Sequence, residues 1–165
     1  RLSNHPRIYV RWYEAWAFTQ WLTVQYRQRG WLQDDWIIRL PTQEEWEIAA
    51  RYLDHRIYPW GDEFDSNKAN TLEGDGISQT TSVGLYPMGI QHELNLYDLS
   101  GNIWEWCLTI SATGNNSLAE DSAHVLRGGS WSNGDYDARC TSRFAGNPDR
   151  KSDLIGFRVV CLPGG

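Results

Sequence analysis

Hydrophobic residues follow a helical spacing in the first part of the chain. Between Arg11 and Arg29, apolar positions recur at steps of about three and four residues, and Gly30 follows at the point where a helix would stop. This spacing predicts a helix over residues 11–29. Its expected buried face consists of Trp12, Ala15, Trp16, Leu22 and Tyr26.

A second helix is predicted to begin at Thr42. Thr42 and Glu45 have the spacing of a capping box, in which a hydroxyl and a carboxylate each accept a hydrogen bond from a free backbone N–H at the helix start. Glu47 and Arg51 mark the solvated face of this helix. The expected apolar face consists of Trp46, Ala49, Ala50 and Leu53. We interpret both helices as scaffold.

The pattern changes after Tyr58. Gly, Asn, Asp, Ser and Thr are scattered between short apolar stretches up to the end of the chain, which is typical of loops with short strands. Strands are predicted at residues 81–85, 103–109, 125–127 and 156–162. Because we find no internal repeat or linker, the sequence indicates one α+β domain over residues 1–165.

Composition excludes several classes of protein. A net charge of -6 and a pI of about 5.1 argue against a basic phosphate-binding surface, so no nucleic-acid partner is expected. No apolar stretch approaches the ~20 residues that span a bilayer, so no membrane span is expected either. Cys107, Cys140 and Cys161 lack a CxxC spacing, which argues against a zinc site or a disulfide framework and favours a reducing, cytoplasmic compartment. Ten Trp residues indicate an aromatic-rich core. Since the chain begins with Arg1 rather than Met, we expect it to be the C-terminal part of a longer protein with other domains.

Five motifs in order carry a family resemblance. They are "RLPTQEEWEIAAR", "YPWGD", "NLYDLSGNIWEW", "LRGGSW" and "IGFRVV", and they lie within residues 39–160. Together they resemble the formylglycine-generating-enzyme family, also called the sulfatase-modifying-factor family. The resemblance implies a C-type-lectin-like fold, in which two helices flank a small, irregular antiparallel sheet with extensive loops.

The resemblance also implies calcium as a structural cofactor. Calcium binds about six to eight oxygens, partly from backbone carbonyls, and such sites can hold loops that lack other partners. Asn, Asp and Glu would supply side-chain oxygens, and the other positions would supply carbonyls. The family's sites map onto Asn70, Thr71, Asp75 and Ile77, and onto Asp98, Gly101, Ile103 and Glu105. From the residues alone, "DLSGNIWE" is equally a turn that enters a strand.

The catalytic part of the family pattern is missing. Enzymes of this family oxidise a substrate cysteine with two cysteines placed shortly after "GGS", where their thiolates hold copper. Here that place reads "WSNGDYDAR", with Asn133 near the first expected cysteine and Cys140 further along. A carboxamide is neither a soft-metal ligand nor a redox group, so we expect no copper and no enzyme activity. The histidines at positions 5, 55, 92 and 124 show no ligand spacing either.

Residues 132–154 have an unusual composition. Lys, Glu, Gln, Met and Trp are represented there by Lys151 alone. Mutation of Asn codons at their adenines would produce this depletion, and such mutation is the hallmark of diversity-generating retroelements. Their variable proteins resemble this chain, because they place a variable segment between "RGGSW" and "GFRVV", here about residues 131–158. The resemblance implies ligand-binding side chains at Ser132, Asn133, Asp135, Tyr136, Asp137, Ser142, Phe144, Gly146, Arg150, Ser152, Asp153 and Leu154, with Trp131 at the floor of the patch.

Three functional hypotheses remain open from the sequence. The favoured one is a non-catalytic variable protein of a diversity-generating retroelement that recognises a partner, expected to be a protein, through residues 132–154. The first alternative is an inactive formylglycine-generating-enzyme-like module in a signalling or adaptor protein. The second is a formylglycine-generating oxidase. Glycan binding is a weaker form of the first hypothesis, since a fold does not supply a sugar site by itself.

Overall fold

The computed structural model describes residues 4–73, 77–116, 118 and 122–164. The two expected helices are confirmed as α1, Trp12–Gln28, and α2, Gln43–Arg51. At the start of α2, the Thr42 hydroxyl accepts from the N–H of Glu45 at 3.1 Å, and the Glu45 carboxylate accepts from the N–H of Thr42 at 2.8 Å. The capping box therefore forms as predicted. Neither helix is long and apolar enough to cross a bilayer.

The buried face of α2 is shorter than the sequence suggests. Trp46 and Ala50 are buried, but the helix ends at Arg51, because Tyr52 takes a left-handed φ of 50°. Leu53 falls in the 3₁₀ turn η1, Tyr52–Asp54, where its side chain is 72% exposed. The prediction that Leu53 is buried was therefore wrong.

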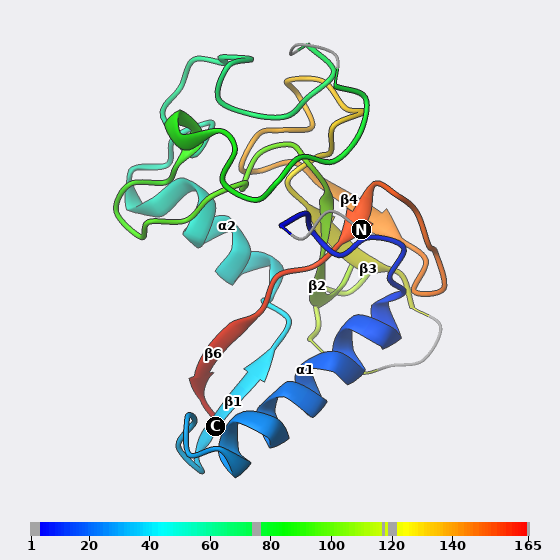
Figure 1. Cartoon of the computed structure of the whole chain (residues 1–165). Coiled ribbons are helices and arrows are strands. Elements are labelled where there is room, and N and C mark those ends of the chain that lie inside the picture. Colours follow the sequence, from blue (N-terminus) through cyan, green and yellow to red (C-terminus); the bar gives the residue numbers. More distant parts are fainter. Residues whose placement is uncertain (1–3, 74–76, 117, 119–121, 165) are drawn as a thin grey trace.

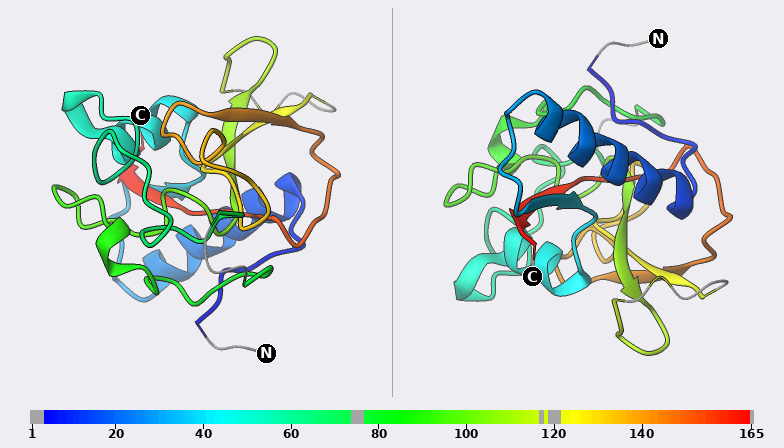
Figure 2. Two further views of the ribbon diagram at one scale, coloured as in Figure 1. Left: turned by 90° about the horizontal axis from the view of Figure 1, so that it is seen from above. Right: turned by 90° about the horizontal axis from the view of Figure 1, so that it is seen from below.

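Two small sheets carry the rest of the fold (Figure 1). The first has four strands in the order β4-β3-β2-β5, which are Arg143–Gly146, His124–Arg127, Trp104–Ile110 and Ile155–Gly156. Its β2–β5 pair is parallel, and its other pairs are antiparallel. The second sheet pairs β1, Trp36–Arg39, with β6, Val160–Pro163. Helix α1 lies along this second pair, as Figures 1 and 2 show.

The predicted strands are partly confirmed. Strands β2 and β3 lie where they were expected, whereas the single strand predicted at residues 156–162 is divided between β5 and β6. No strand forms at residues 81–85. There the N–H of Val83 donates to the carbonyl of Asn4, and that of Leu85 donates back to Ser82 in a turn. Strands β1 and β4 were not predicted.

The core is rich in tryptophan, as expected. Trp12, Trp46, Trp104 and Trp106 are buried. The indole N–H of Trp12 donates to the carbonyl of Cys107 at 2.9 Å, and that of Trp106 donates to Val10 at 2.9 Å. These bonds join α1 and the segment before it to β2, one of the two inner strands of the four-stranded sheet, so the aromatic rings are fixed in place.

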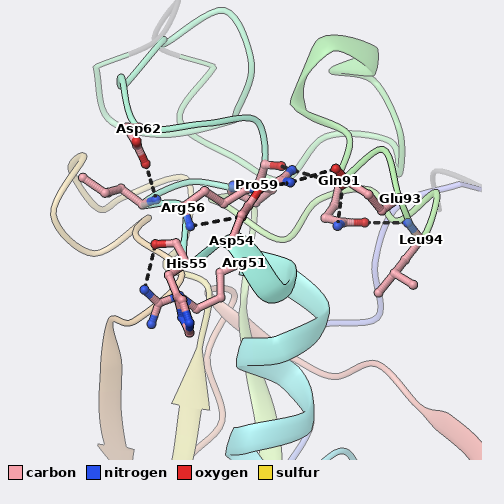
Figure 3. Close-up of polar contacts among 10 residues, drawn as sticks. Arg51, Asp54, His55, Arg56, Pro59, Asp62, Gln91, Glu93 and Leu94 are labelled. Atoms are coloured by element: carbon pink, nitrogen blue, oxygen red, sulfur yellow. Dashed lines mark hydrogen bonds and ion pairs between the residues drawn. The ribbon is translucent and has the colours of Figure 1, made fainter.

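Side-chain hydrogen bonds hold the irregular segments that gather above α2 in Figure 1. Arg56 donates to the Asp54 carboxylate and, through Nη2, to Glu93 at 2.8 Å (Figure 3). Gln91 is fully buried, and its amide donates to Glu93 at 2.9 Å while accepting from the N–H of Leu94 at 2.7 Å. This network joins the end of α2 to residues 91–94. Side-chain hydrogen bonds therefore hold part of the loop region.

Candidate ligand-binding surface

The segment predicted to bind ligand runs from β3, through β4, to β5 in the four-stranded sheet. After β3 the chain turns through residues 128–142, returns as edge strand β4, and then passes to β5 on the opposite edge. Three of the four residues of β4 are exposed. Tyr136 is 68% exposed and Phe144 is 47% exposed. The segment thus presents large aromatic side chains at the surface.

A pocket of about 290 Å³ opens within this segment. Its apolar wall comes from the scaffold strands, through Trp104, Leu126 and Ile155. The other lining residues are Asn133, Asp137, Phe144, Arg150 and Leu154, and all five belong to the predicted ligand-binding set. Residues far apart in the segment therefore meet around one cavity.

Aromatic rings and a guanidinium shape the mouth of the pocket. The rings of Trp104 and Phe144 are tilted by 42° with centroids 6.1 Å apart. The Arg150 guanidinium lies 5.6 Å from the centroid of Phe144, a cation-π distance. Asp137 supplies a carboxylate to the same pocket. The site thus offers an aromatic surface with one positive and one negative group.

Asn133 ties the pocket wall to the scaffold. Its Oδ1 accepts from the indole N–H of Trp104 at 2.8 Å and from the hydroxyl of Ser130 at 2.5 Å. Its Nδ2 donates to Asp137 Oδ2 at 2.8 Å, and its backbone carbonyl accepts from the N–H of Leu72 at 3.0 Å. The residue near the family's first catalytic cysteine position therefore serves here as a hydrogen-bonding hub.

A second exposed group lies on residues 135–139. The Arg139 guanidinium is 5.0 Å from the ring centroid of Tyr136, and it lies 3.8 Å from the Asp135 carboxylate. The N–H of Asp135 donates to Glu73 at 2.9 Å. These contacts fix the backbone of the turn while leaving the Tyr136 ring exposed.

The remaining predicted positions differ in their surroundings. Ser132 is exposed, whereas Ser142, Ser152 and Asp153 are half-buried. Ser152 and Asp153 are linked by a side-chain hydrogen bond of 3.2 Å. Trp131, which was expected at the floor of the patch, is half-buried and does not line the pocket around Phe144, where Trp104 lies instead. Its indole nitrogen is buried with no hydrogen-bond partner among the described residues.

Gly146 differs from the exposed predicted positions. It is buried at the end of β4, and a Cβ built there would lie 2.5 Å from the Trp106 ring and 2.8 Å from Leu126. A side chain could enter this position only if Trp106 or Leu126 moved, so the structure favours a scaffold role for Gly146 over the predicted role in ligand binding.

Three of the residues in the second predicted calcium set meet in one cavity. Asp98, Ile103 and Glu105 line a space of about 220 Å³, and Arg158 lines it as well. Arg158 Nη2 donates to Glu105 Oε1 at 2.7 Å, and its Nε donates to Oε2, which also accepts from the indole of Trp46 at 2.7 Å. Both carboxylate oxygens of Glu105 therefore have hydrogen-bond partners. The sequence did not predict that Arg158 would pair with Glu105, although Arg158 lies in the "IGFRVV" motif.

Asp98 has different hydrogen-bond partners from Glu105. Its carboxylate accepts from the N–H of Gly84 at 2.8 Å, and burial raises the pKa of this carboxyl above its ordinary value. Gly101, with a φ of 73°, lies so close to Asn70 that a Cβ would be 2.3 Å from the Asn70 carbonyl oxygen. The described residues contain no cluster of three His, Cys, Asp or Glu placed to hold a metal. A cation at Asp98 would thus take further oxygens from the backbone.

The first predicted calcium set is only partly described. Asn70 and Thr71 are buried and Ile77 is 37% exposed, while Asp75 lies outside the described residues. The Asn70 amide donates to the carbonyl of Gln79 at 2.9 Å. Thr71 Oγ1 is buried and has no hydrogen-bond partner within the described part of the chain.

Two of the three cysteines, Cys107 and Cys140, are buried thiols. Cys107 and Cys140 are fully buried, and burial raises the pKa of Cys140 to about 12 and that of Cys107 further. Cys140 lies in a turn, and its N–H donates to the carbonyl of Ile57. Neither cysteine lines the pocket around Phe144. Thiols in this state react slowly, because the thiolate is the nucleophile.

Two helices, a small mixed sheet and long ordered loops define a C-type-lectin-like α+β domain, which confirms the predicted fold class. Residues 1–162 match the Sulfatase-modifying factor enzyme 1-like domain, and the chain belongs to this family. The predicted resemblance is thereby confirmed.

Relatives of several kinds share the domain. The chain is 36% identical over 170 residues to the "Inactive C-alpha-formylglycine-generating enzyme 2" of Bos taurus, covering 94% of this chain and 50% of that protein. It is 34% identical over 171 residues to the "Serine/threonine-protein kinase Pkn1" of Chlamydia trachomatis, covering 96% and 24%. Among solved structures, "Treponema denticola variable protein 1" has a TM-score of 0.82 at 23% identity, covering 99% of this chain and 73% of that one. The chain spans half or less of these two sequence relatives, and the structural likeness shows the fold.

Proposed function

We propose that this chain is a non-catalytic binding domain that recognises a protein partner through the pocket and exposed side chains of residues 132–154. The observation that carries the proposal is the meeting of five predicted positions around one pocket over Trp104. Tyr136 and Phe144 supply rigid aromatic contact area, as Tyr does in antibody paratopes, and Arg150 and Asp137 supply charge. The scaffold strands hold the floor of the pocket.

A binding role agrees with the chemistry of the pocket. Its lining residues supply no thiol, and Asn133 is engaged in hydrogen bonds to the scaffold. One of the relatives bears the name of an inactive formylglycine-generating enzyme, which supports a non-catalytic role. An oxidase would need a reactive thiol pair where this chain has a carboxamide.

We further propose that residues 132–154 are diversified by a retroelement. The depletion of five residue types in this segment and the fold likeness to a variable protein support this origin. The test is to sequence the DNA that flanks the gene and to compare codons 131–158 with any nearby repeat. We expect a reverse-transcriptase gene and mismatches confined to template adenines at exposed positions such as Ser132, Asp135 and Tyr136, with none at Gly146.

The absence of a repeat and a reverse transcriptase would contradict diversification. The result would favour the alternative of a fixed module in a signalling protein, for which the Pkn1 relative is an example of a kinase that contains a similar region. Binding by the pocket would then be tested separately from its origin.

A stability experiment tests whether the surface can vary on a fixed scaffold. A variant with alanine at the exposed positions Ser132, Tyr136, Phe144 and Arg150 should lose no more than about 2 kcal/mol in the free energy of unfolding, because each such surface change alters stability by no more than about 0.5 kcal/mol. Circular dichroism melting measures this. A large loss of melting temperature would show that these side chains hold the fold, which would refute their assignment as a free recognition surface.

We also propose that calcium binds at Asp98. The cavity there combines the carboxylates of Asp98 and Glu105 with one guanidinium, from Arg158, so one negative charge is uncompensated. Calcium should raise the melting temperature, by an amount equivalent to about 2.7 kcal/mol at a hundredfold excess over Kd. Asp98→Asn keeps an acceptor for the Gly84 N–H and should abolish the shift, whereas the exposed control Asp149→Asn should retain it. No shift for wild type in calcium would refute the proposal.

A further inference from the structure

A larger cavity lies outside the recognition segment's pocket, and the proposed function does not use it. It has a volume of about 470 Å³ and sits between the segment that leads into α1, the first turns of α1, and Phe157. In Figure 1 this is where the N-terminal segment and the connection to β5 pass beside α1. The N–H of Trp12 donates to the carbonyl of Pro148 at 3.0 Å, which joins these parts. The two pockets share no lining residue.

Aromatic rings form the apolar wall of this cavity. Phe18 and Phe157 meet edge to face with centroids 5.6 Å apart, and Tyr9 and Val10 complete the wall. Phe18 is 41% exposed and Tyr9 is 56% exposed. Rings left open to solvent around a concavity of this size are typical of small-molecule sites, which commonly measure about 300–1,000 Å³.

The backbone at Tyr9 is held in an unfavourable conformation. Its φ of 58° lies in the left-handed region, which a bulky residue seldom adopts. The N–H of Tyr9 donates to the carbonyl of Ser152 at 2.9 Å, and the next residue, Val10, accepts from the Trp106 indole at 2.9 Å. The surrounding structure therefore imposes the conformation that places Tyr9 at the cavity. Imposed strain of this kind is concentrated at functional sites.

The charged rim carries one uncompensated positive group. The Glu14 carboxylate accepts from Lys151 Nζ at 2.8 Å and from the N–H of Arg11 at 2.8 Å, so Lys151 and Glu14 neutralise each other. Arg7 is exposed, and its guanidinium has no hydrogen bond or ion pair to any described residue. A free guanidinium at the edge of an aromatic cavity is complementary to a carboxylate, which it can bind with two parallel N–H donors.

We propose that this cavity binds a small molecule that carries an aromatic ring and a carboxylate. The ring packs against Phe18 and Phe157, and the carboxylate pairs with Arg7. Of the seven residues that line the cavity, only Lys151 lies within residues 132–154, and none lines the pocket around Phe144, so its ligand can be retained while the recognition surface changes.

The test uses the whole chain and two matched probes, naphthylacetate and its neutral amide, naphthylacetamide, with affinities measured by isothermal titration calorimetry. The acid should bind at least about tenfold more tightly than the amide, because only the acid pairs with the guanidinium. Arg7→Gln should weaken the acid by at least about tenfold and leave the amide unchanged. Phe18→Ala should weaken both probes. Arg7 and Phe18 are both partly exposed, and melting curves of the variants will show that they are folded.

Two controls locate the site. Arg29→Gln removes an exposed arginine at the far end of α1, where it stacks on Trp31 at 5.0 Å, and should leave both affinities unchanged. Phe144→Ala alters the recognition pocket and should also have no effect. The proposal is overturned if wild type binds neither probe, if acid and amide bind equally, if Arg29→Gln acts like Arg7→Gln, or if Phe144→Ala weakens the acid.

Discussion

Replacing Gly146 with alanine tests the boundary between scaffold and recognition surface. Gly146 ends the edge strand that carries Phe144, and its φ is not in the left-handed region, so the backbone itself would accept alanine. The obstacle is space. The new methyl group would lie 2.5 Å from Trp106, whose indole is fully buried and bonded to the carbonyl of Val10. Trp106 can move aside only by breaking that bond or displacing its neighbours.

The expected effect is that of overpacking a well-filled core, a loss of about 1–3 kcal/mol in the free energy of unfolding. For a domain of this length, the loss corresponds to a melting temperature lower by about 2–12 °C. Urea unfolding followed by tryptophan fluorescence measures the change, and an unchanged m value would show that the unfolded state is not altered. The matched control Ala145→Ser changes the exposed neighbour on the same strand and should stay within about 0.5 kcal/mol of wild type. If Gly146→Ala were as stable as the control, the position would be free to vary and the scaffold role of Gly146 would be refuted.

Three further results are expected. Burial lowers the pKa of His124, so below about pH 6.5 the unfolded chain takes up a proton that the folded chain does not. The free energy of unfolding should therefore fall as the pH drops below this value, and it should fall less in His124→Gln. Equal slopes of unfolding free energy against pH in urea titrations of the two proteins would contradict this. At neutral pH a thiol reagent should label exposed Cys161 rapidly and buried Cys140 only after denaturation. Fast labelling of the folded Cys161→Ser variant would contradict this prediction, because its remaining thiols include Cys140. Arg127, whose side chain is 1% exposed, pairs with Glu47. Arg127→Met should lower the free energy of unfolding, measured in urea, by about 3 kcal/mol, because it leaves the Glu47 carboxylate without this partner. A loss below about 1 kcal/mol would show that the pair contributes little.

Local signals in the sequence were sufficient for the helices. The capping box at Thr42 and the spacing of Trp12 and Ala15 depend on neighbours within a few residues, and both helices form where expected. The end of α2 was placed too late, because Leu53 continues the apolar spacing although the backbone at Tyr52 has left the helix.

Strands depended on distant partners, and the sequence predicted them less well. Strand β4 has three exposed residues and one buried glycine, so it shows no alternation of apolar and polar residues, and its pairing with β3 defines it. Residues 81–85 do alternate, but their backbone groups bond to Asn4 and within a turn. A strand is formed by its partners, which a local pattern does not identify.

The recognition pocket was predicted in part for the same reason. The motifs that bracket the segment pointed to Asn133, Phe144 and Arg150, because all three lie between these motifs in the sequence. The floor residue Trp104 comes from β2, and its place beneath them follows from sheet order. The cavity at Arg7 joins residues more than a hundred positions apart, and no spacing in the sequence signals such a meeting.

The chain between β4 and β5 has spare length. These strands lie at opposite edges of a four-stranded sheet, a separation of about 14 Å at the usual strand spacing. Residues 147–154 could extend over about 26 Å, so the connection arches outward and brings Arg150 to the pocket. The arch is fastened where Pro148 and Ser152 accept backbone hydrogen bonds from the start of α1 and the segment before it. A residue inserted or deleted between these two points would change the reach of the arch without moving either strand, so this domain can vary its surface by loop length as well as by side chain.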